Sequence, residues 1–352
     1  MFFPVLAKCM DNGKVVYDDK DKILSAHGGG LFFKDNIYYF YGEYRMECPN
    51  GNTCDSNQKV MMYSTKDFKK WKSHGAVLNL VGDRNNWDIE RPKIIYNEST
   101  KKYIMWFHLE KYRQYAFNSG YAGVAVSENI DGPYRLLNFQ RPNRGVKALS
   151  NDTSGRYPKR EEVADRLNTE NFRNGHQVRD LTLFKDKDNV AYLIYNSEDN
   201  HELHIAQLNK TYTGFSGLYT RIFVGGWNEA PAVFTYHGKY YLITSGTTGY
   251  NPNPISYAVS DSMLGQWKKF NNPIVSLSKE DKDTSFHSQP TFVFTCKNNN
   301  YIYLGDRWDM TVKWKSLAKS TYVWLPLKIS DNKISISWVD KINPSDYCKV
   351  IN

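Results

Sequence analysis

The sequence predicts an all-β fold and, within that class, a five-bladed β-propeller. Three observations support this prediction. Short segments rich in aromatic and β-branched residues follow one another along the 352 residues, helical periodicity is almost absent, and one multi-strand pattern occurs five times. Radial repetition of similar sheets leaves only short, protected sheet edges. A β-sandwich would not explain a unit that recurs at intervals of roughly 60 residues.

Each repeat has the same order of parts. A polar residue near Gly or Pro is followed by a short apolar run, a polar turn and a second strand dense in aromatic residues. A third strand follows the hairpin, for example at 60–64 and 122–127. The hairpins span residues 27–41, 90–107, 180–195, 229–244 and 289–304, and they begin at His27, Glu90, Asp180, Glu229 and Gln289.

The widest gap between repeats contains the one helical stretch that we expect, from Lys159 to Asn171. We interpret it as part of a loop insertion around 140–176. No interior linker divides the chain, so residues 1–352 are predicted to form a single domain in which 24–340 make the propeller.

Composition excludes several classes of protein. Hydrophobic residues make up 41% and charged residues 24%, which is ordinary for a folded chain. No apolar run approaches the roughly 20 residues that span a bilayer, so we expect no membrane segment. The net charge is 46 − 37 = +9, but Lys is scattered beside Asp and Glu and no basic stripe occurs, so we expect no nucleic-acid partner.

The cysteines and glycosylation sequons leave the compartment open. Cys48 and Cys54 flank a turn-rich loop and could close a small disulfide. This pair and the sequons at Asn97, Asn151 and Asn209 favour the secretory pathway or the extracellular space. The N-terminus, however, lacks the basic start of a secretion signal.

We predict no metal site and no cofactor. No CxxC pair occurs, which argues against a zinc ribbon. Residues 186–189 lack the glycine and the distal glutamate of a calcium loop. The run from His201 to His204 falls on an expected strand and does not have the spacing of a metalloprotease motif.

The five repeat starts predict a functional site. The first strand of each propeller blade lines the axis, so these starts should converge at one end of the ring, where they would bring three carboxylates together. Taken singly, each has an ordinary explanation, such as neutralisation of Asp180 by Arg179. Clustered carboxylates suit glycoside hydrolysis, because burial and like charge keep one acid protonated while a group on the opposite face activates water. Inversion needs the two groups about 6.5–9.5 Å apart, which facing blades can supply.

Aromatic side chains on the loops are candidates to stack on sugar rings. Most aromatic residues of this chain, 15% of the total, should instead pack between blades. The stacking candidates are Tyr41, Trp106, Tyr121, Tyr250 and Trp308.

The chain resembles glycoside hydrolase family 43, whose members are inverting five-bladed propellers, and most closely the branch of exo-β-1,3-galactanases and related galactosidases. The similarity covers roughly residues 24–340. It rests on AHGGG (26–30), YFYGEYR (39–45), ERPKIIYN (90–97), RDLTLFKDKD (179–188), NEAPAVF (228–234), TSGTTGYNPNP (244–254), SQPTFV (288–293), GDRW (305–308) and YVWLPL (322–327).

The resemblance implies roles for the ring residues. Glu229 matches the general acid, and Asp180 matches the carboxylate that tunes and orients it. His27 stands where most of the family has a catalytic-base Asp, a departure that the galactanase-like branch shares. Gln289 matches a Gln to which that branch assigns the role of the base. Because an amide is a poor base, Gln289 would have to act through its imidic tautomer or only hold the water in place. Glu90 matches a substrate-binding carboxylate and is the alternative base.

The resemblance also implies an exo-acting, inverting enzyme that releases galactose or a similar sugar from galactan-type side chains. Two alternatives stay open: an α-L-arabinofuranosidase or β-galactofuranosidase, and a sugar-binding propeller without turnover. Retention of both Asp180 and Glu229 argues against the binding protein. The expected partner is an oligo- or polysaccharide, and the expected state is a monomer. The further substrate-binding candidates are His27, Tyr41, Glu43, Trp106, Arg179, Thr247, Asn251, Arg307 and Trp308.

Overall fold

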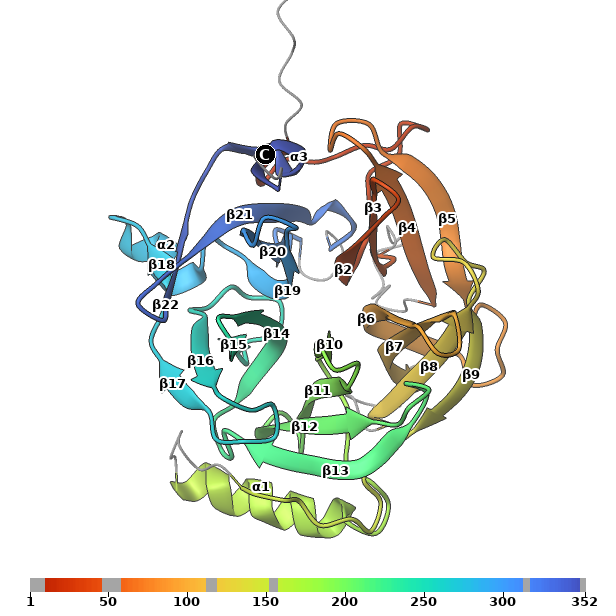
Figure 1. Ribbon diagram of the computed structural model, residues 1–352, viewed down its shortest axis with the longest axis vertical. Coiled ribbons are helices and arrows are strands. Elements are labelled where there is room, and N and C mark those ends of the chain that lie inside the picture. Colours follow the sequence, from red (N-terminus) through yellow and green to blue (C-terminus); the bar gives the residue numbers. More distant parts are fainter. Residues whose placement is uncertain (1–9, 46–57, 112–118, 152–157, 313–316, 349–352) are drawn as a thin grey trace, which may run out of the picture.

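The computed structural model describes residues 10–45, 58–111, 119–151, 158–312 and 317–348. Five sheets stand in a ring around a central axis (Figure 1). The five-bladed propeller predicted from the sequence is therefore confirmed. In the described part of the chain, none of the helices has the length and apolar character needed to cross a bilayer.

In each blade, four antiparallel strands follow one another in chain order from the axis outward. Blade 1 comprises β2 (His27–Lys34), β3 (Ile37–Glu43), β4 (Lys59–Thr65) and β5 (Lys72–Asn79). Blade 2 comprises β6 (Trp87–Asn97), β7 (Lys102–Lys111), β8 (Tyr121–Ser127) and β9 (Arg135–Gln140). Blade 3 comprises β10 (Leu181–Lys185), β11 (Ala191–Ser197), β12 (Glu202–Leu208) and β13 (Phe215–Ile222).

Blades 4 and 5 complete the ring. Blade 4 comprises β14 (Asn228–Tyr236), β15 (Lys239–Gly246), β16 (Ser256–Ser260) and β17 (Lys268–Phe270). Blade 5 comprises β19 (Gln289–Thr295), β20 (Tyr301–Arg307), β21 (Thr321–Ser330) and β22 (Lys333–Ser337). Its outermost strand, β18 (Ile274–Val275), pairs in parallel with β22.

The first strand of every blade lies at the axis, where β2, β6, β10, β14 and β19 contact one another in a closed circle. Strand direction alternates within each blade. The starts of the first strands, the turns between second and third strands, and the links between blades therefore share one end of the ring, which we call the mouth.

The first and last described strands meet where blades 5 and 1 adjoin. Strand β1 (Met10–Asp11) pairs with β23 (Lys341–Ile342). Asn12 donates from Nδ2 to the carbonyls of Trp324 and Val339 (both 2.9 Å) and accepts at Oδ1 from the Trp324 amide (2.6 Å). A disulfide, Cys296–Cys348, fixes the short helix α3 (Pro344–Tyr347) near β19. The proposed Cys48–Cys54 pair lies outside the described residues.

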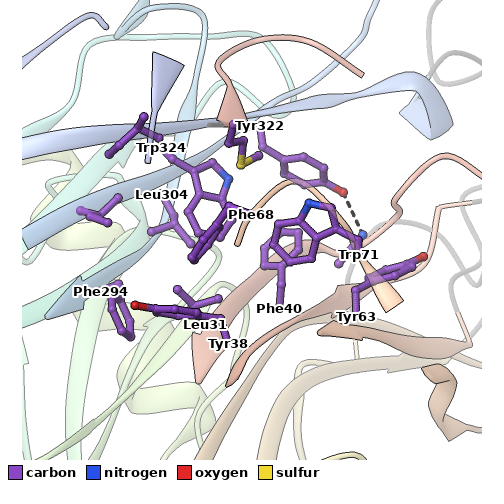
Figure 2. Close-up of a cluster of buried hydrophobic side chains, with 14 of the residues drawn as sticks. Leu31, Tyr38, Phe40, Tyr63, Phe68, Trp71, Phe294, Leu304, Tyr322 and Trp324 are labelled. Atoms are coloured by element: carbon purple, nitrogen blue, oxygen red, sulfur yellow. Dashed lines mark hydrogen bonds between the residues drawn. The ribbon is translucent and has the colours of Figure 1, made fainter. Parts of the chain in front are cut away.

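The core consists of the spaces between neighbouring blades. Figure 2 shows the cluster between blades 5 and 1, in which the Phe68 ring meets the edges or faces of Trp71 and Trp324 at 5.6 and 5.3 Å between centroids. All three side chains are almost completely buried. Because each large aromatic buries about 150–250 Å², these contacts make a major contribution to holding the blades together.

The predicted helix is confirmed as α1 (Pro158–Asn171), which lies along the outer strand β13 (Figure 1). Arg221 on β13 contacts Asp165 on the helix at 2.8 Å. The short helix α2 (Lys279–Thr284), the turn η1 (Leu317–Lys319) and the two-residue strands were not predicted. Elements this short have no measurable periodicity.

Candidate active site

The starts of the five first strands converge at the mouth, as the repeat pattern predicts. In three blades a bulge or irregularity interrupts the pairing of the first strand directly after the site residue, at His27, Glu90 and Glu229, and in blade 5 it follows Pro290, one residue after Gln289. In three of them the next residue has a left-handed backbone: Gly28 (φ 59°), Arg91 (φ 54°) and Ala230 (φ 54°). A bulge bends its strand and re-aims the neighbouring side chains.

Each of these three left-handed residues donates its backbone N–H to a carboxylate of the preceding blade, so the same arrangement occurs three times around the ring. The donor and acceptor pairs are Gly28 N to Asp306 Oδ2 (2.8 Å), Arg91 N to Glu43 Oε2 (2.7 Å) and Ala230 N to Asp180 Oδ2 (3.1 Å). These carboxylates therefore join adjacent blades at the axis.

Glu229 and Gln289 face each other across blades 4 and 5. Oε1 of Glu229 accepts a hydrogen bond from Nε2 of Gln289 at 2.8 Å. Oε1 of Gln289 accepts from Nη2 of Arg91 (2.5 Å) and from Nε1 of Trp308 (2.9 Å). Two N–H donors on its oxygen fix the orientation of the amide, so its NH₂ group points at Glu229.

Burial, followed by the charge of Asp180, raises the pKa of Glu229 to about 8. Arg91 and the hydrogen bond from Gln289 oppose this shift but do not cancel it. Asp180 is held by Nη2 of Arg91 at 3.0 Å. A carboxyl group with this pKa keeps its proton at neutral pH, which a general acid requires.

Glu90 has the opposite environment. Its oxygens contact Nη2 of Arg45 (3.3 Å) and Nδ1 of His108 (3.2 Å). Burial acts to raise the pKa of Glu90, but the His108 hydrogen bond and the charges of His108, Arg45 and Arg91 outweigh it and lower the pKa to about 2. On the far side of its ring, His108 contacts Glu110 at 3.0 Å. Glu90 is therefore a fixed anion and a weak base.

Arg91 joins these groups into one cluster. Besides its bonds to Gln289 and Asp180, it donates from Nη1 to the carbonyl of Pro290 at 3.0 Å. Its side chain is almost fully buried. From the sequence, Arg91 has an ordinary interpretation as a surface partner of Glu90; only its place at the bulge distinguishes it.

Aromatic rings and a guanidinium group form one wall of the mouth. The rings of Tyr250 and Trp308 meet edge to face at 5.0 Å. The guanidinium of Arg45 lies 5.5 Å from the Tyr250 ring and 5.7 Å from the Trp308 ring. The loop after β15 thus extends to blades 5 and 1. The sequence predicted both aromatic residues but missed Arg45.

Comparison with known proteins identifies the family. The family model for glycosyl hydrolases family 43 matches residues 147–320. A solved structure of the GH43 β-1,3-galactosidase BT3683 with galactodeoxynojirimycin is 37% identical, with a TM-score of 0.86, and the match covers 95% of this chain and 100% of that chain. The chain belongs to glycoside hydrolase family 43. It is therefore a glycosidase that acts on a saccharide.

Two further structures support membership of family 43. The exo-β-1,3-galactanase 1,3Gal43A from Clostridium thermocellum is 30% identical, with a TM-score of 0.77 over 96% of this chain and 66% of that chain. An exo-β-1,3-galactanase from Phanerochaete chrysosporium, solved with galactose, is 25% identical, with a TM-score of 0.75 over 95% and 67%. No match was found among curated protein sequences.

In this family 43 enzyme, three of the expected substrate-binding residues lie away from the mouth. Tyr41 is buried between blades, where its hydroxyl accepts from the amide of Ile94 at 3.0 Å. Trp106 is fully buried and donates to the carbonyl of Tyr212 at 2.8 Å. The guanidinium of Arg307 stacks on Trp338 at 5.6 Å. Core packing thus surrounds the rings of Tyr41 and Trp106, and the guanidinium of Arg307 is directed at Trp338.

Two more expected residues lie behind the site. His27 is fully buried, with Nδ1 3.2 Å from Asp306 and its ring 5.2 Å from that of Trp308. It thus supports the aromatic wall from within. Glu43 is also buried and holds Arg45 through Nε at 2.9 Å.

The remaining candidates lie around the mouth. Arg179 contacts Asp199 at 2.5 Å, and the Thr247 hydroxyl donates to the carbonyl of Trp227 at 2.9 Å. Asn251 lies in the same loop as Thr247. Tyr121 packs in blade 2 instead, where its ring meets Trp87 at 6.2 Å.

Among the residues that the structure describes, no group of three side chains placed to hold a metal includes Glu229. In the described part of the chain one such group exists, His176, Glu198 and His204 in blade 3.

Proposed function

We propose that this family 43 hydrolase is an exo-acting enzyme that releases terminal β-1,3-linked galactose with inversion of configuration. The observation that carries the proposal is Glu229 with a raised pKa, placed beside Asp180 and an oriented Gln289. The galactosidase and galactanase structures reported above support the choice of sugar.

Glu229 supplies the proton in this mechanism. It donates to the glycosidic oxygen as the bond to the anomeric carbon breaks, and its raised pKa keeps that proton available at neutral pH. Asp180, which pairs with Arg91, favours the protonated form of Glu229 by like-charge repulsion. Asp180 thereby acts as a positioning and tuning residue.

Gln289 and Glu90 have different tasks. Without substrate, the amide of Gln289 donates to Glu229 at 2.8 Å and is held by Arg91 and Trp308. We propose that a sugar entering between Gln289 and Glu229 separates the two side chains, so that Gln289 positions the attacking water on the face opposite the acid. Glu90 is ionised and weakly basic, so it accepts hydrogen bonds from sugar hydroxyls rather than a proton from water. Arg45 and the aromatic wall hold the same sugar.

A product-resolved substrate screen tests the proposal. The purified chain is incubated with aryl β-galactoside, aryl α-arabinofuranoside and β-1,3-galactan, and proton NMR follows the first product. We expect galactose as the sole early product from galactan, released as the α-anomer. Cleavage of the arabinofuranoside alone would transfer the assignment to an arabinofuranosidase. Binding of galactan without any release would support a sugar-binding propeller.

Retention of configuration would overturn the mechanism, because it needs a nucleophilic carboxylate about 5 Å from the acid. We also propose that the enzyme acts as a monomer, which light scattering of the purified protein would check.

A further inference from the structure

A second cluster of titratable side chains lies outside the active site, in the outer part of blade 3. His176 comes from the segment that follows α1, Glu198 from the turn between β11 and β12, and His204 from β12. All three are completely buried. One potential ligand atom from each lies within 4.8 Å of the others.

The hydrogen bonds around His204 prepare one of its nitrogens to bind a metal. Nε2 lies 2.6 Å from Oε1 of Glu202, which also pairs with Arg221 through Oε2 at 2.6 Å. An ionised carboxylate only accepts, so Nε2 carries the proton and Nδ1 keeps its lone pair. Nδ1 faces the Tyr195 hydroxyl at 3.2 Å. A carboxylate behind the second ring nitrogen is the usual support of a metal-binding histidine.

Glu198 needs a positive charge. Its Oε1 lies 2.5 Å from Nδ1 of His176, and Oε2 accepts from Asn171. Arg221 pairs with Glu202 and Asp165. Among the described residues, the basic side chain that pairs with Glu198 is that of His176. Burial of an ionised carboxylate is costly unless a cation compensates it.

Asn143 adds a buried oxygen beside this cluster. Its Nδ2 donates to the Tyr195 hydroxyl at 3.1 Å, the same hydroxyl that faces His204. Its Oδ1 is buried and has no hydrogen-bond partner. Buried polar atoms normally have a hydrogen-bond partner, so the unpaired Oδ1 of Asn143 needs an explanation.

We propose that His176, Glu198 and His204 form a binding site for one divalent transition metal, with Zn²⁺ as the ion that two imidazoles and one carboxylate fit best. Complete burial makes the site structural, so it is filled as the chain folds. Binding to His176 replaces the proton that its Nδ1 shares with Glu198. That proton moves to Nε2, toward the Tyr219 hydroxyl at 3.2 Å, or leaves to solvent.

The position of the site suggests what the metal stabilises. His176 belongs to the segment that leads into Asp180, and Glu198 adjoins Asp199, the partner of Arg179. A metal would therefore tie the helix-bearing insertion and the β11–β12 turn to blade 3, behind the residue that tunes the general acid. The site could not be recognised in the sequence because its three ligands come from separate segments. Of these ligands, only His204 lies in a motif considered from the sequence, the run from His201 to His204.

The test refolds the full chain from denaturant with a slight excess of Zn²⁺ or with a chelator, followed by removal of free metal. We expect about one zinc per chain by elemental mass spectrometry, and a thermal midpoint at least about 3 °C higher than without metal. His204→Gln should lose the bound zinc. His201→Gln is the matched control, since His201 lies three residues before His204, in the β11–β12 turn and outside the cluster, and it should keep the zinc.

A chain without bound zinc under these conditions would overturn the proposal, as would zinc retention by His204→Gln. If that variant does not fold, Co²⁺ added during refolding of the unaltered chain decides the question. Visible absorption of a four-coordinate, histidine-bound cobalt that disappears on zinc exchange would support the site. Absence of that absorption would overturn it.

Discussion

The proton on Glu229 depends on a few neighbours that are far apart in the sequence. Burial removes water from the carboxyl group, and Asp180 adds a negative charge nearby, so the pKa rises to about 8. Glu90 is also a glutamate at the start of a first strand, yet its pKa falls to about 2 because His108 and Arg45 contact it. The two residues share a place in the repeat and have opposite chemistry.

Replacement of the acid tests its role directly. Glu229→Gln should lower turnover of unactivated galactosides by about 10²–10⁴-fold, the usual contribution of general acid catalysis. A substrate with a good leaving group should be affected less, because its departure needs little protonation. The measurement is kcat on galactan and on an activated aryl galactoside. Equal losses on the two substrates would show that Glu229 is not the acid.

The pH profile reports the influence of Asp180. Because Glu229 acts in its protonated form, kcat/KM should fall as pH rises through about 8. Asp180→Asn removes the neighbouring negative charge and should move this alkaline limb to lower pH, besides lowering the rate. Asp188→Asn, in the hairpin turn of the same blade, is the control and should leave the limb in place. An unshifted limb in Asp180→Asn would show that burial alone sets the pKa.

Azide rescue distinguishes the two candidates for activating water. Gln289→Ala should nearly abolish hydrolysis while sugar binding persists, and azide should restore some rate and yield a glycosyl azide of inverted configuration. Glu90→Ala should mainly raise KM, without an azide effect, because Glu90 is a weak base. Rescue of Glu90→Ala but not of Gln289→Ala would exchange the two roles.

At the scale of elements, the bulges of the first strands decide how the site residues are presented. In blades 1, 2 and 4, a left-handed residue at the bulge directs its N–H to a carboxylate of the preceding blade; these residues are Gly28, Arg91 and Ala230. Left-handed backbone is costly for residues other than Gly, and such strain tends to occur at functional sites. The Gly and Pro residues at the repeat starts thus mark the positions of these bulges. The sequence pattern indicated the positions, but the bulged backbone itself is visible only in the structure.

Gly28→Ala tests this device. A Cβ at Gly28 would lie 2.9 Å from Oε2 of Glu43 and 3.0 Å from Cδ of Arg91. We expect a lower thermal midpoint and a loss of activity, because both neighbours belong to the active site. Gly75→Ala is the control: its φ is also positive, at 74°, but nothing lies within 4 Å of the added Cβ. If Gly28→Ala lowers the thermal midpoint more than Gly75→Ala does, the difference measures the crowding of the added Cβ against Glu43 and Arg91. Equal effects of the two substitutions would mean that the side chains around Gly28 move aside at no cost.

At the scale of the whole molecule, the ring must be closed between its first and last blades. Asn12 performs part of this closure through three hydrogen bonds to the backbone of Trp324 and Val339. The aromatic cluster of Figure 2 fills the same junction. Closure therefore combines a specific polar contact with a large buried apolar area.

Asn12→Ala should lower the free energy of unfolding by about 2–4 kcal/mol, since it leaves buried backbone groups without partners. Chemical denaturation would measure this loss. Asn79→Ala, which removes one local bond to the amide of Val81 at an exposed site, should change stability by less than about 1 kcal/mol. A small effect of Asn12→Ala would show that water satisfies the freed groups.

The amino-acid pattern by itself determined the strand-rich fold, the number of blades, the helix of the insertion and the positions of the ring residues. Period-two strands and repeated turns are local properties, so they can be recognised without tertiary contacts. The pattern did not separate the buried rings of Tyr41 and Trp106 from the wall ring of Trp308, because an aromatic residue on a strand or just beyond its end looks the same in the sequence whether it faces the core or the mouth.

Tertiary structure alone decided the electrostatics. The place of Arg91 among Asp180, Gln289 and Pro290, the cations around Glu90 and the histidine cluster of blade 3 all depend on groups from different blades or segments. Desolvation and charge act through distances of a few ångströms, and no sequence spacing encodes which residues of a closed ring come that close.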